Sequence, residues 1–199
     1  MTSYSDYLFL LSQPRAVKEL IDKYKKASAK HIGEFKSMHS PAHISVMHAE
    51  RQKPFFADRT VTHMEHVLKF MPPVVLHIDG FKYFSHLHSH YTIYAHIRIT
   101  PAVDAWFTLL KKNLKMRGTL VPHITVVRNV AEDDFNILWP HFRHKKLIEP
   151  FWIKEMKVVK RETFDNFAKW EPFKTFKFSG MKGFESRDDR DNWNQVDLF

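Results

Sequence analysis

Apolar residues follow two different spacings along the chain, and the two spacings alternate. Short stretches rich in apolar and β-branched residues, several of them alternating with polar ones, predict strands. The expected strands are 7–11, 42–48, 74–78, 81–84, 92–99, 122–127, 151–160 and 172–178. Apolar residues three or four positions apart predict amphipathic helices, with proline near the start or glycine at the end of some of them. The expected helices lie within 12–33, 58–71, 100–118 and 132–142.

The order strand, helix, strand, helix, strand occurs twice. We therefore expect an α+β fold made of duplicated βαβαβ halves, with small, mostly antiparallel sheets, outer helices and a central cleft. The expected unit is a single bilobal domain over 1–184, with lobes at roughly 1–90 and 91–184. The charged, aperiodic segment 185–199 is interpreted as a C-terminal tail.

The third element of each half carries the same short pattern. The first copy reads Pro-Ala-His-Ile-Ser-Val-Met from Pro41, and the second reads Pro-His-Ile-Thr-Val-Val from Pro122. Side chains alternate across a strand, so His43 shares a face with Ser45, and His123 shares one with Thr125. Each strand thus buries an aliphatic face and offers an imidazole beside a hydroxyl. Two such strands side by side would hold two histidines across one cleft.

Composition narrows the function classes. With 31 Lys and Arg against 22 Asp and Glu, the net charge of +9 favours a polyanionic partner such as nucleic acid, although a generic basic surface gives the same balance. The absence of cysteine excludes disulfides and thiolate chemistry, and no glycine-rich phosphate loop is present. We find no signal peptide and no apolar run long enough for a membrane span, so we expect a cytoplasmic protein.

The paired histidine strands resemble those of the 2H phosphoesterase superfamily, which includes 2′–5′ RNA ligase-like proteins and cyclic phosphodiesterases. The resemblance covers about residues 7–178. It implies a bilobal fold, with His43 and His123 as catalytic residues and Ser45 and Thr125 as phosphate ligands. The expected substrate is an RNA end or nucleotide with a 2′,3′-cyclic phosphate, or a 2′–5′ linkage. The expected enzyme needs no metal or other cofactor.

This chemistry suits a pair of histidines. Opening a cyclic phosphate needs one group to deprotonate water and another to protonate the leaving alkoxide, and an imidazole can do either near neutral pH. The sequence does not assign acid and base between the two, nor does it choose between hydrolysis and ligation. The alternative function is a binding module that holds RNA ends without turning them over. Since one chain supplies both motifs, we expect a monomer.

Three further residues are candidates for a substrate groove. Tyr94, His96 and Arg98 share the polar face of one predicted strand, where Tyr94 could stack on a base and Arg98 could pair with phosphate. A simple solvated strand face explains the same pattern.

Two other groups of residues have a possible function. Alternate histidines at 86, 88 and 90 could gather a metal ion, but no second ligand cluster accompanies them, and a metal protein ranks last. Lysines and aromatic residues interleave between 152 and 178, as in single-stranded RNA-binding surfaces. An aromatic core face backed by lysines is an equally good interpretation.

Overall fold

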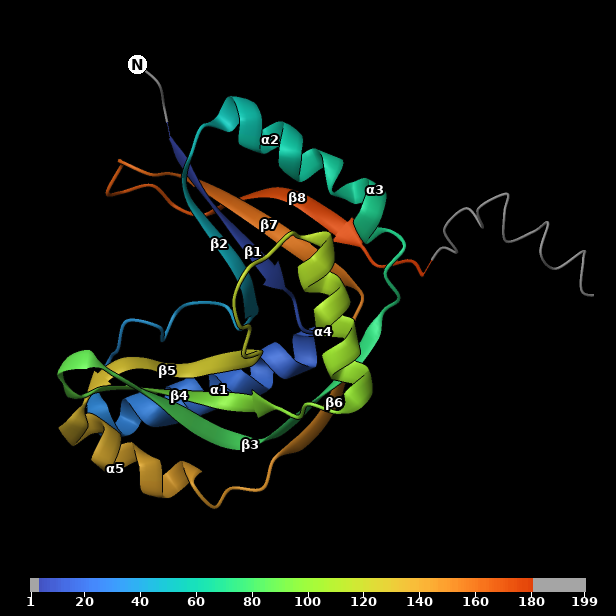
Figure 1. The fold of residues 1–199 in the computed structure, drawn as a ribbon. Coiled ribbons are helices and arrows are strands. Elements are labelled where there is room, and N and C mark those ends of the chain that lie inside the picture. The colour runs from blue at the N-terminus through green and yellow to red at the C-terminus, as the bar shows by residue number, and fades with distance from the viewer. Residues whose placement is uncertain (1–3, 181–199) are drawn as a thin grey trace, which may run out of the picture.

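Two four-stranded antiparallel sheets form the framework of the protein, for which a computed structural model describes residues 4–180 (Figure 1). The first sheet contains, in spatial order, β2 (Ile44–Gln52), β1 (Ser5–Leu11), β7 (Glu155–Glu162) and β8 (Glu171–Lys177). The second contains β5 (His123–Ala131), β4 (His90–Ile97), β3 (Val74–His86) and β6 (Ile148–Ile153). All neighbouring strands are antiparallel. The expected α+β class with antiparallel sheets is confirmed.

The helices lie beside the sheets rather than between their strands. They are α1 (Arg15–Ile32), α2 (Pro54–His63), α3 (Glu65–Leu68), α4 (Pro101–Asn113) and α5 (Glu132–Phe142), with a short 3₁₀ turn, η1 (Leu87–Ser89). In Figure 1, α2 and α3 lie beside the first sheet, whereas α1 and α5 lie beside the second. No helix within residues 4–180 is long and apolar enough to cross a membrane.

Each sheet contains strands from both halves of the sequence. β3 belongs to the first half but pairs with β4, because η1 joins them as a hairpin. β7 belongs to the second half but pairs with β1. The sheets therefore do not coincide with lobes at 1–90 and 91–184. The expected tail, 185–199, lies outside the described residues.

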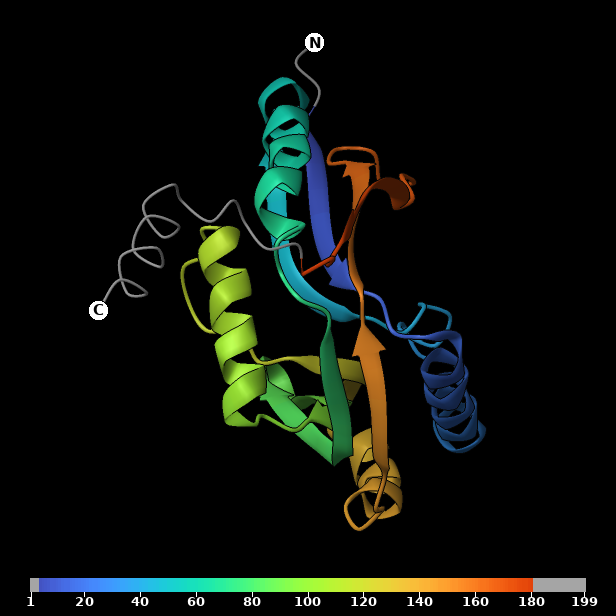
Figure 2. The same ribbon diagram turned by 90° about the vertical axis from the view of Figure 1, so that its right-hand side faces the viewer.

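One expected strand is in fact two. The sequence predicts a single strand over 151–160, but the chain changes sheets at Lys154, so that β6 precedes it and β7 follows it. Figure 2 shows this orange segment running from one sheet into the other. Conversely, the expected break at Asp79-Gly80 is a register shift within a continuous β3, where Gly80 adopts a φ of 70°. Glycine adopts this φ without strain, so β3 continues through the bulge instead of ending there in a turn.

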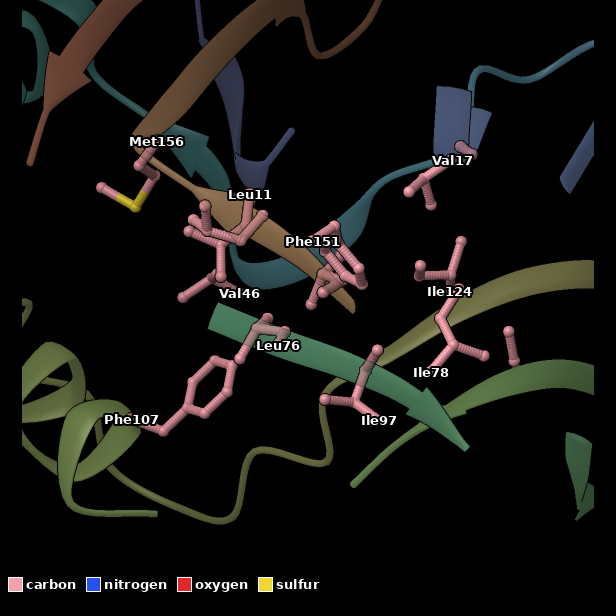
Figure 3. Close-up of a cluster of buried hydrophobic side chains, with 14 of the residues drawn as sticks. Leu11, Val17, Val46, Leu76, Ile78, Ile97, Phe107, Ile124, Phe151 and Met156 are labelled. Carbon is pink, nitrogen blue, oxygen red and sulfur yellow. The ribbon is translucent and has the colours of Figure 1, made fainter. Parts of the chain in front are cut away.

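The core joins the two sheets. Figure 3 shows Leu11 and Val46 of the first sheet packed near Leu76 of the second and Phe107 of α4. Burying a side chain of this size contributes about 1.5–3 kcal/mol, so this contact resists separation of the sheets. Helix α4 begins as expected, since the Thr100 hydroxyl accepts a hydrogen bond from the Val103 amide at 3.3 Å.

Candidate active site

The two histidine strands are β2 and β5, and each is an edge strand of its sheet. His43 immediately precedes β2 and His123 opens β5, so the imidazoles occupy equivalent positions. β2 and β5 also contact one another across the sheets. The two edges that carry the motifs are thus the edges that meet.

Burial follows the same alternation in both motifs. Ile44 and Ile124 are fully buried, whereas each histidine and the hydroxyl residue two positions later are partly exposed. The buried neighbours fix the strands in the core, and the alternation of side chains turns Ser45 and Thr125 to the same faces as their histidines. The aliphatic half of each motif therefore anchors the polar half.

Each imidazole makes the same local hydrogen bond. Nδ1 of His43 lies 2.8 Å from the carbonyl oxygen of Pro41, and Nδ1 of His123 lies 2.8 Å from that of Val121. A carbonyl only accepts, so Nδ1 carries the proton and donates it. The remaining nitrogen, Nε2, is left to take up or release a second proton. This tautomer leaves Nε2 available for general acid–base chemistry.

Burial lowers the pKa of both histidines below the usual value of 6.5. The hydrogen bonds to the two carbonyls oppose this effect, whereas the charge of Arg128 lowers both pKa values further. His43 is additionally affected by the charges of Lys25 and His123. The two histidines are therefore close enough to influence each other, within a cationic setting that suits an anion.

Lys25 is a part of this setting that the sequence did not reveal. It lies on the buried stripe of α1 with Val17 and Ile21, and its side chain is only 2% exposed. Its ammonium donates to the carbonyl oxygens of Ser37, at 3.0 Å, and Ser40. Burial lowers its pKa. Through these hydrogen bonds, Lys25 stabilises the loop between α1 and His43.

The same loop is also hydrogen-bonded to the second histidine strand. The Ser37 hydroxyl accepts a hydrogen bond from the Arg128 amide of β5 at 3.0 Å, although the two residues lie 91 positions apart. One loop thereby connects the buried ammonium of Lys25, the approach to His43 and the strand of His123. The signal in the sequence is a lysine at a core position of a helix.

The three groove candidates of β4 have different surroundings. Tyr94 is only 5% exposed and stacks on Phe84, with ring centroids 4.3 Å apart, so its ring is covered rather than open to a base. His96 stands directly opposite His123 in the sheet. Arg98 follows the end of the strand and donates to the Asp79 carboxylate at 3.1 Å. Two of the three therefore lie beside His123, and the third is held in an ion pair.

Two residues of β3 complete this side of the site and were not foreseen. The ring of Phe84 meets that of His123 edge-on, with centroids 5.0 Å apart, and Tyr94 meets it similarly at 5.1 Å. Lys82 Nζ lies 3.1 Å from Nε2 of His96. The sequence alone did not indicate these residues, because it is the pairing of β3 with β4 that brings them to the site.

The histidines at 86, 88 and 90 are not arranged as a ligand cluster. His86 Nε2 contacts the Thr92 hydroxyl at 2.9 Å, and His90 Nδ1 contacts the carbonyl oxygen of His88 at 2.8 Å. Within residues 4–180, no group of three or more histidine or acidic side chains is placed to hold a metal ion.

The basic and aromatic residues near the C-terminal strands serve mainly the fold. Phe176 and Phe178 are buried in the core. Lys174 forms an ion pair with Glu65 at 2.8 Å, and Lys160 forms one with Asp58 at 2.9 Å. The core interpretation therefore accounts for Phe176 and Phe178, whereas Trp152 of the same segment is 52% exposed.

Comparisons with known proteins identify the family and the fold. A family model described as the 2′-5′ RNA ligase superfamily matches residues 13–165. No protein with a curated description matches the sequence. Among solved structures, TT0787 of Thermus thermophilus is similar with a TM-score of 0.62 and 14% identity, over 89% of this chain and 100% of that one.

Escherichia coli LigT is similar as well. The structure of LigT with phosphate aligns with a TM-score of 0.58 and 15% identity, over 89% of this chain and 99% of LigT. The structure of LigT with 3′-AMP aligns with a TM-score of 0.58 and 12% identity, over 88% and 99% of the two chains. At these identities the structures establish a shared fold.

Proposed function

Because the chain belongs to the 2′-5′ RNA ligase superfamily of phosphoesterases, we propose that it acts on 2′,3′-cyclic phosphates of RNA ends or nucleotides, or on 2′–5′ linkages. The resemblance drawn from the two histidine strands is confirmed at the level of the family. The observation that carries the proposal is the matched pair of imidazoles. Both donate from Nδ1 to a local carbonyl, so both keep Nε2 for a second proton.

In the proposed hydrolysis, one imidazole is neutral and the other is protonated. Nε2 of the neutral imidazole accepts a proton from water as the water oxygen attacks phosphorus. The bond from phosphorus to the 3′-oxygen breaks, and Nε2 of the protonated imidazole gives its proton to that oxygen. The product is a 2′-phosphate, and the total number of protons on the two histidines is unchanged. The two imidazoles supply both proton transfers, so the proposed reaction needs no metal ion or cofactor.

Ser45 and Thr125 have a supporting role in this proposal. Each hydroxyl shares a strand face with its histidine and can donate to a non-bridging phosphate oxygen, where negative charge accumulates in the transition state. The cations Lys25 and Arg128 favour binding of the anionic substrate. The structures of LigT with phosphate and with 3′-AMP support a nucleotide-type ligand for this fold.

Both sheets contribute one histidine strand to the site, and one chain supplies both. We therefore propose that residues 1–184 act as one bilobal unit and that the protein works as a monomer. A monomer predicts that the specific activity does not change when the protein is diluted.

The proposed function is tested by hydrolysis of the four nucleoside 2′,3′-cyclic phosphates in the presence of EDTA. The wild type should form 2′-phosphates, and His43→Ala and His123→Ala should each lower turnover by about 10²–10⁴-fold. His63→Ala, which removes an exposed histidine of α2, is the matched control and should retain full activity. Binding of these nucleotides without turnover by the wild type would favour a binding module instead.

A further inference from the structure

Lys82 and His96 form a polar pair beside His123 that the proposed reaction does not use. His96 stands directly opposite His123 across β4 and β5, and Lys82 projects from β3, the next strand of the sheet. The Nζ atom of Lys82 lies 3.1 Å from Nε2 of His96. An ammonium only donates, so His96 accepts here as a neutral imidazole.

The pair is incompletely satisfied. If Nε2 of His96 accepts, Nδ1 must carry the ring proton, yet Nδ1 is buried and has no hydrogen-bond partner among residues 4–180. Within the same described residues, Lys82 forms no ion pair with a carboxylate. The Asp79 carboxylate already accepts from Arg98, which lowers its pKa, and the charges of His96 and Lys82 both lower that pKa further. Two cations therefore face one carboxylate, which leaves net positive charge at this position.

We propose that Lys82 and His96 bind the phosphodiester that precedes the reacting phosphate in an RNA chain. This inference rests on the proposed function and specifies its substrate as an RNA end of at least two nucleotides. A phosphodiester carries one negative charge shared by two non-bridging oxygens, both of which accept hydrogen bonds. It would accept from the Lys82 ammonium in a charge-assisted hydrogen bond. Burial and the charge of Lys82 lower the pKa of His96, and the negative charge of the phosphodiester would oppose this effect, so that Nε2 of a protonated His96 could donate to it as well.

The strand geometry separates this subsite from the histidine site. Neighbouring strands lie about 4.8 Å apart, so His96 is one spacing from His123. Lys82 begins on β3, two spacings from β5, and its side chain reaches back to His96. A mononucleotide places its single phosphate at the histidines and leaves the Lys82 subsite empty. A dinucleotide that ends in a cyclic phosphate has a second phosphate to fill it. Phe84, partly exposed beside Lys82, adds an aromatic surface for a base.

The test compares cytidine 2′,3′-cyclic phosphate with the dinucleotide uridylyl-(3′,5′)-cytidine 2′,3′-cyclic phosphate. The wild type should have a higher kcat/KM for the dinucleotide. Lys82→Met, which keeps the side-chain length and removes the charge, should lower kcat/KM for the dinucleotide by about tenfold and for the mononucleotide by less than about threefold. Lys82→Arg should restore the preference, and Lys23→Met, at an exposed lysine of α1, should match the wild type on both substrates.

Equal losses on the two substrates, or no loss on either, would overturn the subsite. Failure of the proposed function is distinguished because the wild type would then hydrolyse neither the mononucleotide nor the dinucleotide. In that case, calorimetric titration with cytidine 2′-phosphate and with the corresponding dinucleotide 2′-phosphate decides the inference. Tighter binding of the dinucleotide that Lys82→Met abolishes would support the subsite, and equal affinities would refute it.

Discussion

The surroundings of His43 and of His123 differ, although the two motifs share their sequence pattern, their hydrogen bond to a carbonyl and their pattern of burial. Beside His43 lies a loop fastened by the buried ammonium of Lys25. Beside His123 lie the rings of Phe84 and Tyr94 and the imidazole of His96. The duplicated strands thus place two imidazoles in equivalent positions, and the elements around them make the two sides chemically distinct.

The largest expected effect within this comparison comes from the hydroxyls, which are the shared part of the two sides. Ser45→Ala and Thr125→Val should each lower kcat by about 10–100-fold, because each removes a donor to the phosphate in the transition state. The rates come from steady-state kinetics on a cyclic nucleotide. A loss confined to one of the two variants would show that the phosphate contacts only one strand.

On the His43 side, Lys25→Met should raise the pKa of His43. The charge of Lys25 disfavours protonation of His43, so its removal favours the protonated form and moves the titration to higher pH. NMR titration of the two imidazoles measures the change. His123 is the internal control, since Lys25 does not contribute to the lowering of its pKa. Equal shifts of both histidines would mean that the substitution alters the whole site.

On the His123 side, Phe84→Leu should have the smallest effect, a loss of about threefold in kcat/KM. The substitution removes an edge-on contact with the imidazole of His123 and the stack on Tyr94, and such aromatic pairs contribute about 0.5–1.5 kcal/mol. The pKa of His43 should not change. Steady-state kinetics together with the same NMR titration would detect either outcome, and a shift of His43 would contradict the separation of the two sides.

Local sequence patterns predicted the parts of this fold that depend on neighbouring residues. The alternation around His43 and His123 and the cap at Thr100 are readable because strand faces and helix starts are set within a few positions. The chain gives no comparable signal at Lys154, where one extended segment passes between two sheets. The sheet to which a strand belongs depends on partners far along the sequence. The pairing of β3 with β4 and of β7 with β1 could therefore not be predicted from local patterns.

The candidate site shows the same division. The imidazoles and hydroxyls follow from the two motifs, but their neighbours come from other elements. In the sequence, Lys25 only interrupts the apolar stripe of a helix. The structure shows that its ammonium donates to the carbonyl oxygens of Ser37 and Ser40. Tyr94 reads as an exposed aromatic residue until Phe84, on the adjacent strand, covers it.

The pH dependence of kcat/KM for cytidine 2′,3′-cyclic phosphate tests the central claim most directly. If one imidazole acts as base and the other as acid, the wild-type profile is bell-shaped, because activity is lost at low pH with the base and at high pH with the acid. The residual activity of His43→Ala and of His123→Ala should each lack one limb, and the two variants should lack opposite limbs. A bell-shaped profile that persists in either variant would contradict the two-histidine mechanism.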